Sequence, residues 1–360
     1  MKRNGTTSCG TQRWRCKACG ASATHKINSD AKQLKTFLSW LFSKNAQADM
    51  IGGGRTFRRK TSHFWSIWAM PPIIDEIHNV IYIDGIYISR KLVVLIASTD
   101  DYVLGWYLAR SEHSKAWGAL MSRIAPPEIV VTDGACGFEK ARKQYWPNTE
   151  VQRCVLHAFR QVRRYTTSRP KLPAGIELYG LAQELKKLKT LKDADCWVSN
   201  YLNWCSQWDE FLEEKSYGED GRWSYTHWRL RKARSSLNRI IGSNQIFTYL
   251  TSNLAKAISL PSTNNRAESI NAQLRRMLRI HRGLSPIRRV KAVFWWCYMH
   301  TEYPKNEAEI LKDMPTDEKI DKIYRSLTEQ RQRFDSIPQW GDAIVWSELH
   351  TSEPWRHDWD

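Results

Sequence analysis

The segment Ile81-Tyr82-Ile83-Asp84-Gly85 runs from an apolar, β-prone stretch into an aspartate and then a glycine. The same design recurs about fifty residues later in Ile129-Val130-Val131-Thr132-Asp133-Gly134. Short runs rich in β-branched and aromatic residues that end at glycine are typical of strands followed by a turn. The sequence therefore predicts two strands, each of which presents an aspartate near its end.

The pattern around Asp84 predicts a mixed α/β sheet. Three strand-like runs separated by short polar turns come first, over residues 80–88, 92–98 and 102–108. A helix, a strand, a second helix and a short strand follow, over residues 114–124, 128–132, from about Ala135, and 150–152. Three antiparallel strands followed by alternating helices and strands is the order of the RNase H-like fold. In that fold the first and fourth strands end side by side, so we expect Asp84 and Asp133 to lie close together.

A third carboxylate lies in Thr263-Asn264-Asn265-Arg266-Ala267-Glu268-Ser269, which predicts the first turns of a helix that continues to Arg276. Glu268, Asn271 and Arg275 are three and four residues apart, which places them on one helix face. A carboxylate with an arginine on the same face can act as a metal ligand beside a phosphate anchor. The alternative is a solvated helix with an ordinary charged stripe.

Carboxylates in these positions suit metal-dependent phosphoryl chemistry on nucleic acid. Two divalent cations about 3.5 to 4 Å apart can activate an oxygen nucleophile and stabilise the leaving oxygen, and Mg²⁺ prefers carboxylate ligands. We expect two Mg²⁺ (or Mn²⁺) ions per active site, with Asp84 bridging both, Asp133 holding one and Glu268 the other. Asp-Gly is also a common turn dipeptide, so the alternative for either aspartate alone is an ordinary turn.

The charge of the chain favours a polyanionic partner. Its 360 residues carry a formal net charge of +18, with a pI near 9.6. Residues 1–70 hold 13 Lys and Arg against two acidic residues, a local charge of +11, whereas residues 301–360 hold 8 against 14, a local charge of −6. The N-terminal end is therefore the predicted nucleic-acid-binding end. The alternative is a basic protein without such a partner.

Cys16 and Cys19 form a Cys-x2-Cys knuckle followed by Gly20, which is half of a zinc ribbon. Cys9 and His25 are the nearest additional ligands. Three interpretations are open: Zn²⁺ bound by these four residues, a ribbon that lacks its upstream cysteine pair, or thiols without a metal.

The next region, residues 29–72, predicts a helical unit. Its first helix has apolar residues at the spacing of one buried face, namely Leu34, Phe37, Leu38, Leu41 and Phe42. A short second helix over residues 45–50 and a third over residues 56–65 complete the outline of a helix-turn-helix, whose last helix enters the major groove. Arg58, Arg59 and Lys60 on that helix are the predicted DNA contacts. A plain helical linker is the alternative.

Residues 165–260 lack strand signals and predict an all-α insertion rich in tryptophan. We interpret its tryptophans as helix-packing core, with a DNA-stacking surface as the alternative. The tryptophans concerned are Trp197, Trp204, Trp208, Trp223 and Trp228.

Nothing in the sequence predicts a membrane or secreted protein. No apolar run reaches the roughly 18 to 20 residues that a membrane helix needs, and the N-terminus lacks a hydrophobic signal core. The eight cysteines are scattered along the chain, unlike the framework of a disulfide-rich secreted domain. We therefore expect a cytoplasmic protein without a membrane partner.

Four segments, by their combination and order, resemble those of the mutator-type DDE transposases, the insertion-sequence transposases related to plant Mutator elements. The segments span residues 82–85, 131–134, 152–157 and 263–275, and with the N-terminal knuckle the resemblance covers roughly residues 1 to 300. It implies an RNase H-like core with a helical insertion between the second aspartate and the glutamate. It also implies dependence on Mg²⁺, recognition of terminal inverted repeats, and DNA cleavage followed by strand transfer.

Cys154 and His157 belong to the same family pattern, and their role is open. They could join two further ligands in a zinc site, or His157 could lie beside the catalytic carboxylates. Without the resemblance, a Cys and a His on one helical turn are more often core residues. Asn265 is a further expected neighbour of the active site, and Arg275 and Arg276 are expected DNA contacts.

The resemblance implies the transposase of a prokaryotic insertion sequence, with Asp84, Asp133 and Glu268 as catalytic metal ligands. Its partner would be double-stranded DNA, at the transposon ends and at the target. Because both ends must be joined, we expect a homodimer or larger assembly on DNA, associated with the nucleoid. Two other classes stay open: a sequence-specific DNA-binding regulator, and an RNase H-fold nuclease without strand transfer.

The expected organisation has six segments. They are a partial zinc-ribbon-like segment (1–28), a helix-turn-helix region (29–72), the first part of the RNase H-like catalytic core (73–164), the all-α insertion (165–260), the second part of the core with the Glu268 helix (261–303), and an acidic C-terminal tail (304–360).

Overall fold

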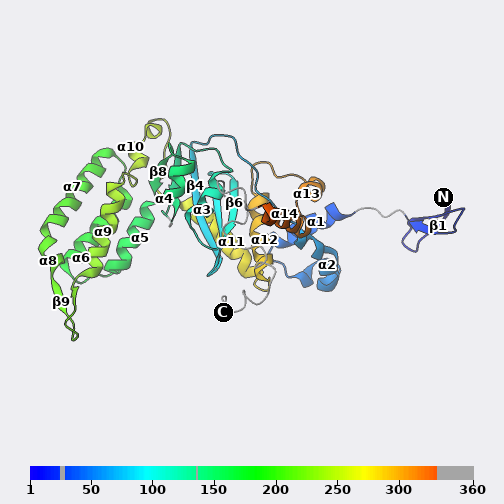
Figure 1. Cartoon of the computed structure of the whole chain (residues 1–360), viewed down its shortest axis with the longest axis horizontal. Helices are drawn as coiled ribbons and strands as arrows, with labels where there is room; N and C mark the ends of the chain where they lie inside the picture. Colours follow the sequence, from blue (N-terminus) through cyan, green and yellow to red (C-terminus); the bar gives the residue numbers. More distant parts are fainter. Residues whose placement is uncertain (25–28, 135–136, 331–360) are drawn as a thin grey trace.

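The computed structural model describes residues 1–24, 29–134 and 137–330. At its centre lies a five-stranded sheet in the order β6-β5-β4-β7-β8 (Figure 1). The strands are β4 (Val80–Ser89), β5 (Leu92–Ser98), β6 (Val103–Ala109), β7 (Ile129–Thr132) and β8 (Glu150–Arg153). The pairs β4–β5 and β5–β6 are antiparallel, whereas β4–β7 and β7–β8 are parallel. The predicted mixed α/β sheet is confirmed.

Helices cover both faces of this sheet, which explains why β5 and β6 are apolar almost throughout. All residues of β5 and β6 are buried. Leu95 packs with the helices on one face and its neighbour Ile96 with those on the other, because successive side chains of a strand point in opposite directions. The covering helices are α3 (Ser114–Met121) and α4 (Phe138–Tyr145) on the first face, and α11 (Asn265–Ile280) and α12 (Pro286–Met299) on the second.

The helix boundaries differ slightly from those expected. The helix predicted over residues 114–124 is α3, which ends at Met121. The helix predicted from about Ala135 is α4, which begins at Phe138 after Gly137, whose φ is +77°. Ala135 itself lies outside the described residues.

The region of residues 29–72 is helical and packs against the sheet-covering helices. It contains α1 (Asp30–Phe42), a 3-10 turn η1 (Gln47–Asp49), α2 (Gly53–Thr61) and a 3-10 turn η2 (Ser62–Ser66). Four of the five apolar residues expected on the buried face of α1 are buried, but Phe42 is exposed at the end of the helix. The third helix, predicted over residues 56–65, is α2, which begins earlier, at Gly53, and ends at Thr61. It begins at Gly53 because the preceding residue, Gly52, has a φ of +86° and is therefore not helical.

Residues beyond 304, expected as an acidic tail, contain two helices within the described part. They are α13 (Glu307–Asp313) and α14 (Asp317–Gln330). Ile310 and Ile320 are buried in the same apolar cluster as the α1 face and α12.

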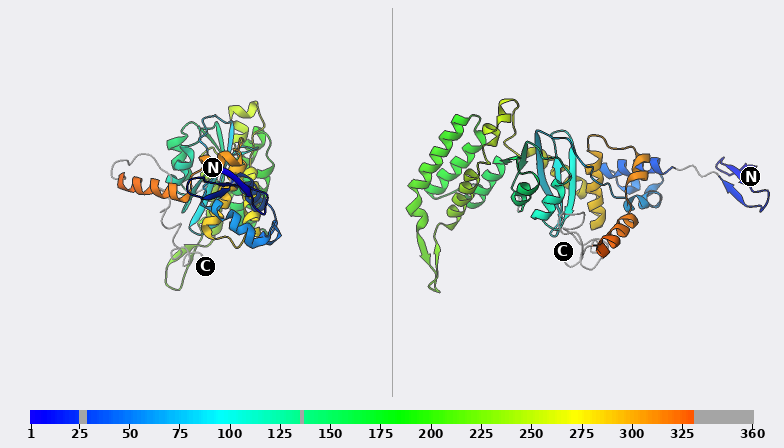
Figure 2. Two further views of the ribbon diagram at one scale, coloured as in Figure 1. Left: turned by 90° about the vertical axis from the view of Figure 1, so that its right-hand side faces the viewer. Right: turned by 45° about the horizontal axis from the view of Figure 1, so that its top comes forward.

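The N-terminal knuckle belongs to a small three-stranded antiparallel sheet. Its strands are β1 (Lys2–Thr6), β2 (Gln12–Arg15) and β3 (Ser22–Thr24). Cys16 and Cys19 lie in the turn between β2 and β3. This sheet stands apart from the rest of the protein in Figure 1 and in the right-hand view of Figure 2.

The insertion between β8 and α11 forms the opposite end of the molecule (Figure 1). Its elements are α5 (Val155–Thr166), α6 (Pro173–Glu184), η3 (Leu185–Lys187), α7 (Leu191–Gln207), α8 (Asp209–Glu213), β9 (Lys215–Tyr217), β10 (Trp223–Tyr225), α9 (Trp228–Gly242), α10 (Thr248–Thr251) and η4 (Asn253–Lys256). The expectation of an all-α insertion is wrong at one place, where β9 and β10 pair as an antiparallel hairpin.

The insertion has its own apolar core. Trp197 and Trp204 are 2% and 3% exposed within it, which fits the packing interpretation of these tryptophans. Trp223 and Trp228 are instead half exposed, on the hairpin and at the start of α9. The packing interpretation is therefore right for Trp197 and Trp204 of α7 and wrong for Trp223 and Trp228.

Hydrogen bonds join the two ends of the insertion to the sheet and to each other. At the last residue of β8, the Arg153 N–H donates to the Gln245 carbonyl at 2.6 Å. At the start of α5, the Val155 N–H donates to the Ser262 carbonyl at 2.9 Å. The chain thus leaves the sheet and returns to it at neighbouring positions, which brings α11 alongside the strands that precede the insertion.

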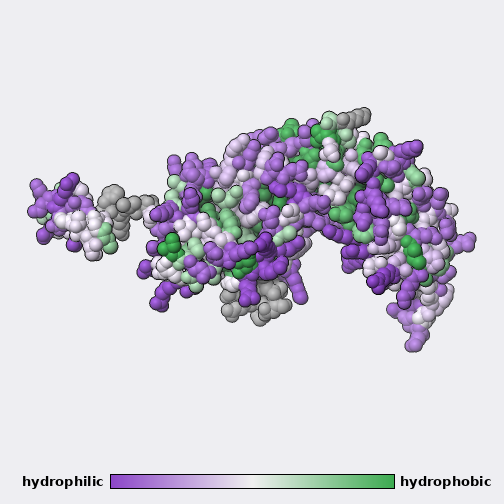
Figure 3. All heavy atoms as spheres, turned by 180° about the vertical axis from the view of Figure 1, so that it is seen from behind, coloured by the Kyte–Doolittle hydropathy of each residue, from purple (hydrophilic) through white to green (hydrophobic). Residues whose placement is uncertain are grey.

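The surface is mostly hydrophilic on the face drawn in Figure 3, with apolar side chains in scattered groups. Among the described residues, no helix has the length and apolar character to cross a bilayer.

Candidate active site at the centre of the sheet

Asp84 and Asp133 are brought together by the parallel register of β4 and β7. Tyr82 lies opposite Val131 in this pairing, and each precedes its aspartate by two residues. The same count along both strands therefore carries the two aspartates to adjacent positions. Consistent with this, the negative charge of Asp133 raises the pKa of Asp84.

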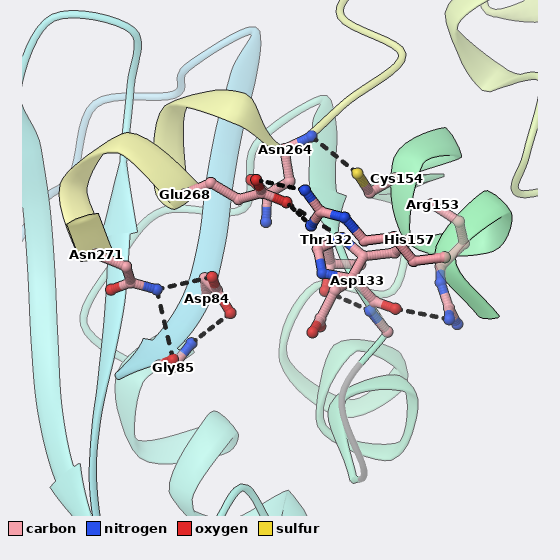
Figure 4. A network of polar contacts seen from close by, with 12 residues as sticks. Asp84, Gly85, Thr132, Asp133, Arg153, Cys154, His157, Asn264, Glu268 and Asn271 are labelled. Atoms are coloured by element: carbon pink, nitrogen blue, oxygen red, sulfur yellow. Dashed lines mark hydrogen bonds and ion pairs between the residues drawn. The ribbon is translucent and has the colours of Figure 1, made fainter. Parts of the chain in front are cut away.

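The Asp84 carboxylate is held by two hydrogen bonds (Figure 4). Its Oδ1 accepts from the Gly85 N–H at 2.8 Å, and its Oδ2 accepts from Asn271 Nδ2 at 2.7 Å. Burial, and then the charge of Asp133, raise the pKa of Asp84 to about 6, while these hydrogen bonds and the charge of Arg275 act in the opposite direction. The Asp84 side chain is thus fixed in place but poorly stabilised as an anion.

A glycine follows each aspartate because a charged side chain lies over it. A Cβ on Gly134, whose φ is +81°, would collide with the Arg153 guanidinium, and Arg153 Nη2 donates to the Asp133 carbonyl at 2.7 Å. A Cβ on Gly85 would collide with the carboxylate of Glu112. The repeated Asp-Gly design therefore reflects close packing at this site.

Glu112 is a carboxylate that the sequence motifs do not reveal. It lies in the loop between β6 and α3. Burial, and then the charges of Asp133 and Asp84, raise the pKa of Glu112 to about 7. In sequence, a glutamate two residues before a helix is expected simply from the helix dipole, so no local signal distinguishes it. In the structure, Glu112 is marked by its contact with Gly85, where a Cβ would collide with the Glu112 carboxylate.

The start of α11 is anchored to β4, as the position of Glu268 requires. Asn264, the residue before α11, is fully buried, and its Nδ2 donates to the Ile83 carbonyl at 2.9 Å. Ala267 packs against Tyr82 and Val131. Glu268 therefore lies beside β4, which carries Asp84 at its middle and not near its end as expected, and beside β7, which ends just before Asp133.

The Glu268 carboxylate is engaged by α5 in this structure. Arg160 Nη1 and Nη2 donate to Glu268 Oε1 and Oε2 at 2.5 and 3.1 Å, an ion pair with two hydrogen bonds. His157 Nδ1 lies 3.8 Å from Oε1 of the same carboxylate. Arg160 was not among the predicted site residues, although it lies one helical turn after His157.

Cys154, His157 and Glu268 form a group whose ligand atoms all lie within 4.8 Å of one another (Figure 4). Cys154 Sγ accepts a hydrogen bond from the Asn264 N–H at 3.2 Å, and burial raises the pKa of this thiol. His157 Nδ1 is buried, without a hydrogen-bond partner in the described part of the chain. A thiol, an imidazole and a carboxylate are ligands that suit a transition metal such as Zn²⁺.

The remaining predicted residues lie at different distances from this centre. Asn265 is the first residue of α11, and Arg275 is close enough for its charge to lower the pKa of Asp84. Arg276 follows it on the exposed side of the helix. The basic residues of α2, which are Arg58, Arg59 and Lys60, are exposed on the other side of the α1 and α12 layer.

The N-terminal knuckle is separate from the site. Hydrogen bonds from the backbone N–H groups of Cys19 and Ala18 lower the pKa of the Cys16 thiol. Within residues 1–24, 29–134 and 137–330, Cys9 does not converge with Cys16 and Cys19 into a group of three ligands. His25, the fourth predicted ligand, lies outside the described residues.

Residues 73–294 match the sequence pattern of the family described as "Transposase, Mutator family". The chain belongs to this family. The matched range contains the sheet, both aspartates, Glu112, the insertion and the Glu268 helix.

Curated relatives carry the same kind of name. The chain is 26% identical over 191 residues to a probable transposase for insertion sequence element ISRM3-like of Sinorhizobium fredii, which covers 48% of each protein. It is 25% identical over 122 residues to a probable insertion-sequence transposase of Corynebacterium diphtheriae, which covers 29% of this chain and 36% of the relative. It is 28% identical over 105 residues to the transposase for IS905 of Lactococcus lactis, covering 25% and 27%. The matched stretches thus span less than half the length of these relatives.

Proposed function

We propose that this member of the Mutator family is the transposase of a prokaryotic insertion sequence, acting on the DNA of its own element. It binds double-stranded DNA at the terminal inverted repeats and catalyses Mg²⁺-dependent cleavage followed by strand transfer into a target. The observation that carries the proposal is the register of β4 and β7, which places Asp84 beside Asp133 at the centre of a mixed sheet. Its element order supports an RNase H-like core.

A divalent cation fits the chemistry of this site. The raised pKa values of Asp84 and Glu112, about 6 and about 7, arise from burial among like charges, a penalty that a bound cation relieves. We propose that Asp84, Asp133 and Glu268 hold Mg²⁺ or Mn²⁺, two ions per site. When bound, these ions neutralise charge on the phosphate and favour the ionised form of the attacking oxygen.

The side chains around the carboxylates have roles of their own. Asn271 orients the Asp84 carboxylate through its hydrogen bond to Oδ2. Arg275, two turns after Glu268 in α11, supplies positive charge where a DNA phosphate would approach. Arg160 holds the Glu268 carboxylate through two hydrogen bonds. If Glu268 held a cation, the Arg160 guanidinium would be available to contact phosphate.

Regions away from the sheet would hold the DNA. The exposed basic residues of α2 and the net charge of +18 support a phosphate-binding surface. The turn at Cys16 and Cys19 supports Zn²⁺ binding by the N-terminal sheet. Because Zn²⁺ takes four ligands, residues other than these two cysteines would supply the rest. Joining two transposon ends calls for a homodimer or larger assembly.

The test is cleavage of DNA that carries the sequences flanking the coding region. Purified protein with Mg²⁺ should nick this DNA at the element termini and join the ends to a target. Asp84→Asn should lower nicking at least about 100-fold while DNA binding persists, since it removes a ligand charge without changing side-chain size. Asp75→Asn, an exposed aspartate before β4, is the matched control and should cleave like the wild type.

Retention of Mg²⁺-dependent nicking by the Asp84→Asn variant contradicts the assignment. Wild-type protein that nicks but never joins ends would be a nuclease, and wild-type protein that binds without nicking would be a regulator.

A further inference from the structure

Cys154, His157 and Glu268 bring a thiol, an imidazole and a carboxylate together from two helices (Figure 4). Cys154 immediately precedes α5 and His157 lies in its first turn, whereas Glu268 lies in the first turn of α11. Their ligand atoms all lie within 4.8 Å of one another, and among the described residues no other three such side chains converge in this way. The fold, and not proximity in sequence, therefore assembles this group.

The separation between the imidazole and the carboxylate suits a tetrahedral transition-metal ion. Zn²⁺ binds a histidine nitrogen and a carboxylate oxygen at about 2.0 to 2.2 Å, so tetrahedral coordination places these two atoms about 3.4 Å apart. His157 Nδ1 lies 3.8 Å from Glu268 Oε1. This distance is too long for a hydrogen bond, and a small movement of either side chain brings it to the value for a shared ion.

A second histidine and glutamate in this chain show the contrast with an ordinary pair. At the base of the β9–β10 hairpin, His227 Nε2 lies 3.0 Å from Glu214 Oε2, which is a normal hydrogen bond. His157 Nδ1 is instead buried, without a hydrogen-bond partner among the described residues. Leaving a buried ring nitrogen without a partner costs free energy. A metal ion between His157 and Glu268 would remove this cost.

The surroundings of Cys154 suit a thiolate ligand. Burial raises the pKa of the Cys154 thiol, but backbone N–H groups act in the opposite direction. One of them is the Asn264 N–H, which donates to Sγ at 3.2 Å, and the others belong to His157 and Leu156 at the start of α5. Such donors stabilise a thiolate, and a bound cation supplies the charge that favours loss of the proton.

We propose that Cys154, His157 and Glu268 bind a transition-metal ion of the Zn²⁺ class, which ties the start of the insertion helix α5 to the start of α11. The side chains of His157 and Glu268 are 32% and 30% exposed, so water can supply the fourth ligand. Arg160, whose side chain is 45% exposed, can turn toward solvent when the ion takes Glu268. The site shares Glu268 with the proposed Mg²⁺ site but does not rest on it, because a thiolate selects a softer metal.

The test uses Co²⁺, which takes the place of Zn²⁺ and gives a charge-transfer absorption band when a thiolate binds it. The full chain carries Cys16→Ser and Cys19→Ser, so that the N-terminal knuckle cannot contribute. We expect this protein to show the band, and Zn²⁺ to abolish it by displacement. Adding Cys154→Ser should abolish the band, and adding His157→Gln or Glu268→Gln should weaken Co²⁺ binding at least about tenfold.

Two further variants in the same background are the matched controls. Cys205→Ser removes a half-buried thiol from α7, and His227→Gln removes the histidine of the other pair. Both should keep the band and the Co²⁺ affinity. A band that survives Cys154→Ser, or an unchanged Co²⁺ affinity in folded His157→Gln, overturns the proposal.

X-ray absorption spectroscopy of the Zn²⁺-loaded Cys16→Ser/Cys19→Ser protein covers the case in which Cys154→Ser fails to fold. We expect one sulfur ligand, with nitrogen and oxygen as the others. Zn²⁺ coordinated without sulfur, or no Zn²⁺ bound, overturns the proposal. Since none of these measurements involves DNA or Mg²⁺, such a result leaves the proposed transposase function standing.

Discussion

Burial and the charge of Asp133 raise the pKa of Asp84 to about 6, against an ordinary value of 3.8. Glu112 is raised from 4.5 to about 7 by burial and the charges of both aspartates. At each position the folded protein binds a proton more tightly than the unfolded chain. The resulting contribution to stability is fully present below about pH 4 and is lost as the pH rises through about 6 to 7. For Asp84 the difference corresponds to at most about 3 kcal/mol.

This linkage predicts how stability depends on pH in the absence of divalent cations. The free energy of unfolding of the wild type should fall between pH 4 and pH 7 more steeply than that of Asp84→Asn, because the variant has no carboxyl to ionise. Urea unfolding across this pH range, in a chelating buffer, measures both slopes. Asp75→Asn should follow the wild type, and added Mg²⁺ should remove most of the difference at pH 7. Equal slopes in the wild type and Asp84→Asn would show that this carboxyl ionises freely.

Individual site residues differ in how far the sequence reveals them. Asp84, Asp133 and Glu268 are each marked by a local pattern, either a strand running into Asp-Gly or an Asn-rich helix start. Glu112 and Arg160 carry no such mark, because each gains its meaning from a contact made through the fold. Arg160 meets Glu268 across 108 residues of sequence, and only the arrangement of α5 against α11 brings them together.

At the scale of elements, the predictions succeeded where side-chain periodicity was strong. The β4 to β6 meander and the parallel strand β7 follow from runs of β-branched and aromatic residues, whereas β8 contains only one such residue, Val151. The hairpin of β9 and β10 was missed because its three-residue strands, Lys-Ser-Tyr and Trp-Ser-Tyr, are almost wholly exposed and offer no buried face to the pattern. The helices α13 and α14 were obscured by the acidic composition of their segment, although Ile310 and Ile320 fix them to the core.

A buried lysine links α12 to α14 and gives this attachment a test. Lys291 is 1% exposed, and its Nζ donates to Asp317 Oδ1 and to the Trp65 carbonyl, both at 2.6 Å. Trp68 Nε1 donates to the same Asp317 oxygen at 2.7 Å. Burial lowers the pKa of Lys291, whereas Asp317 raises it. Asp317 therefore compensates a charge that would otherwise be isolated inside the protein.

Removing either partner should have unequal effects. Asp317→Ala should lower the free energy of unfolding by about 3 kcal/mol, because it leaves the Lys291 charge buried without its counter-ion. Lys291→Met should change it by less than about 1.5 kcal/mol, since an apolar side chain of similar length suits the site. Urea denaturation measures both, with Glu318→Gln on the exposed side of α14 as control. A loss of the same size in all three variants would mean that α14 is not held by this pair.

Across the whole molecule, the sheet lies between the insertion at one end and α1, α2 and the N-terminal sheet at the other (Figure 1). The order of these regions followed from composition and charge in the sequence. Their contacts did not, because α13 and α14 reach the α1 layer from the far end of the chain. The total charge of +18 indicates a polyanionic partner but not which surface meets it.

The exposed basic triplet of α2 should contribute to DNA binding through phosphate contacts. Replacing Arg58, Arg59 and Lys60 together by alanine should weaken binding to any duplex and reduce the slope of log affinity against log salt by up to about 3. Removing the same charge from α14, through alanine at Lys319, Lys322 and Arg325, is the control and should leave the slope nearly unchanged. Fluorescence anisotropy at several salt concentrations gives both slopes. Equal slopes for wild type and the α2 variant would place the DNA elsewhere.

The hydrogen bonds that join the two ends of the insertion also bear on how such proteins diversify. Because the Arg153–Gln245 and Val155–Ser262 bonds close the segment at its base, each doubling of the length between them costs only about 0.6 kcal/mol of loop-closure entropy. Helices beyond α5 can therefore be lengthened or exchanged while β8 and α11 keep their places. The first helix of the segment, α5, has to stay, because its Arg160 is paired with Glu268.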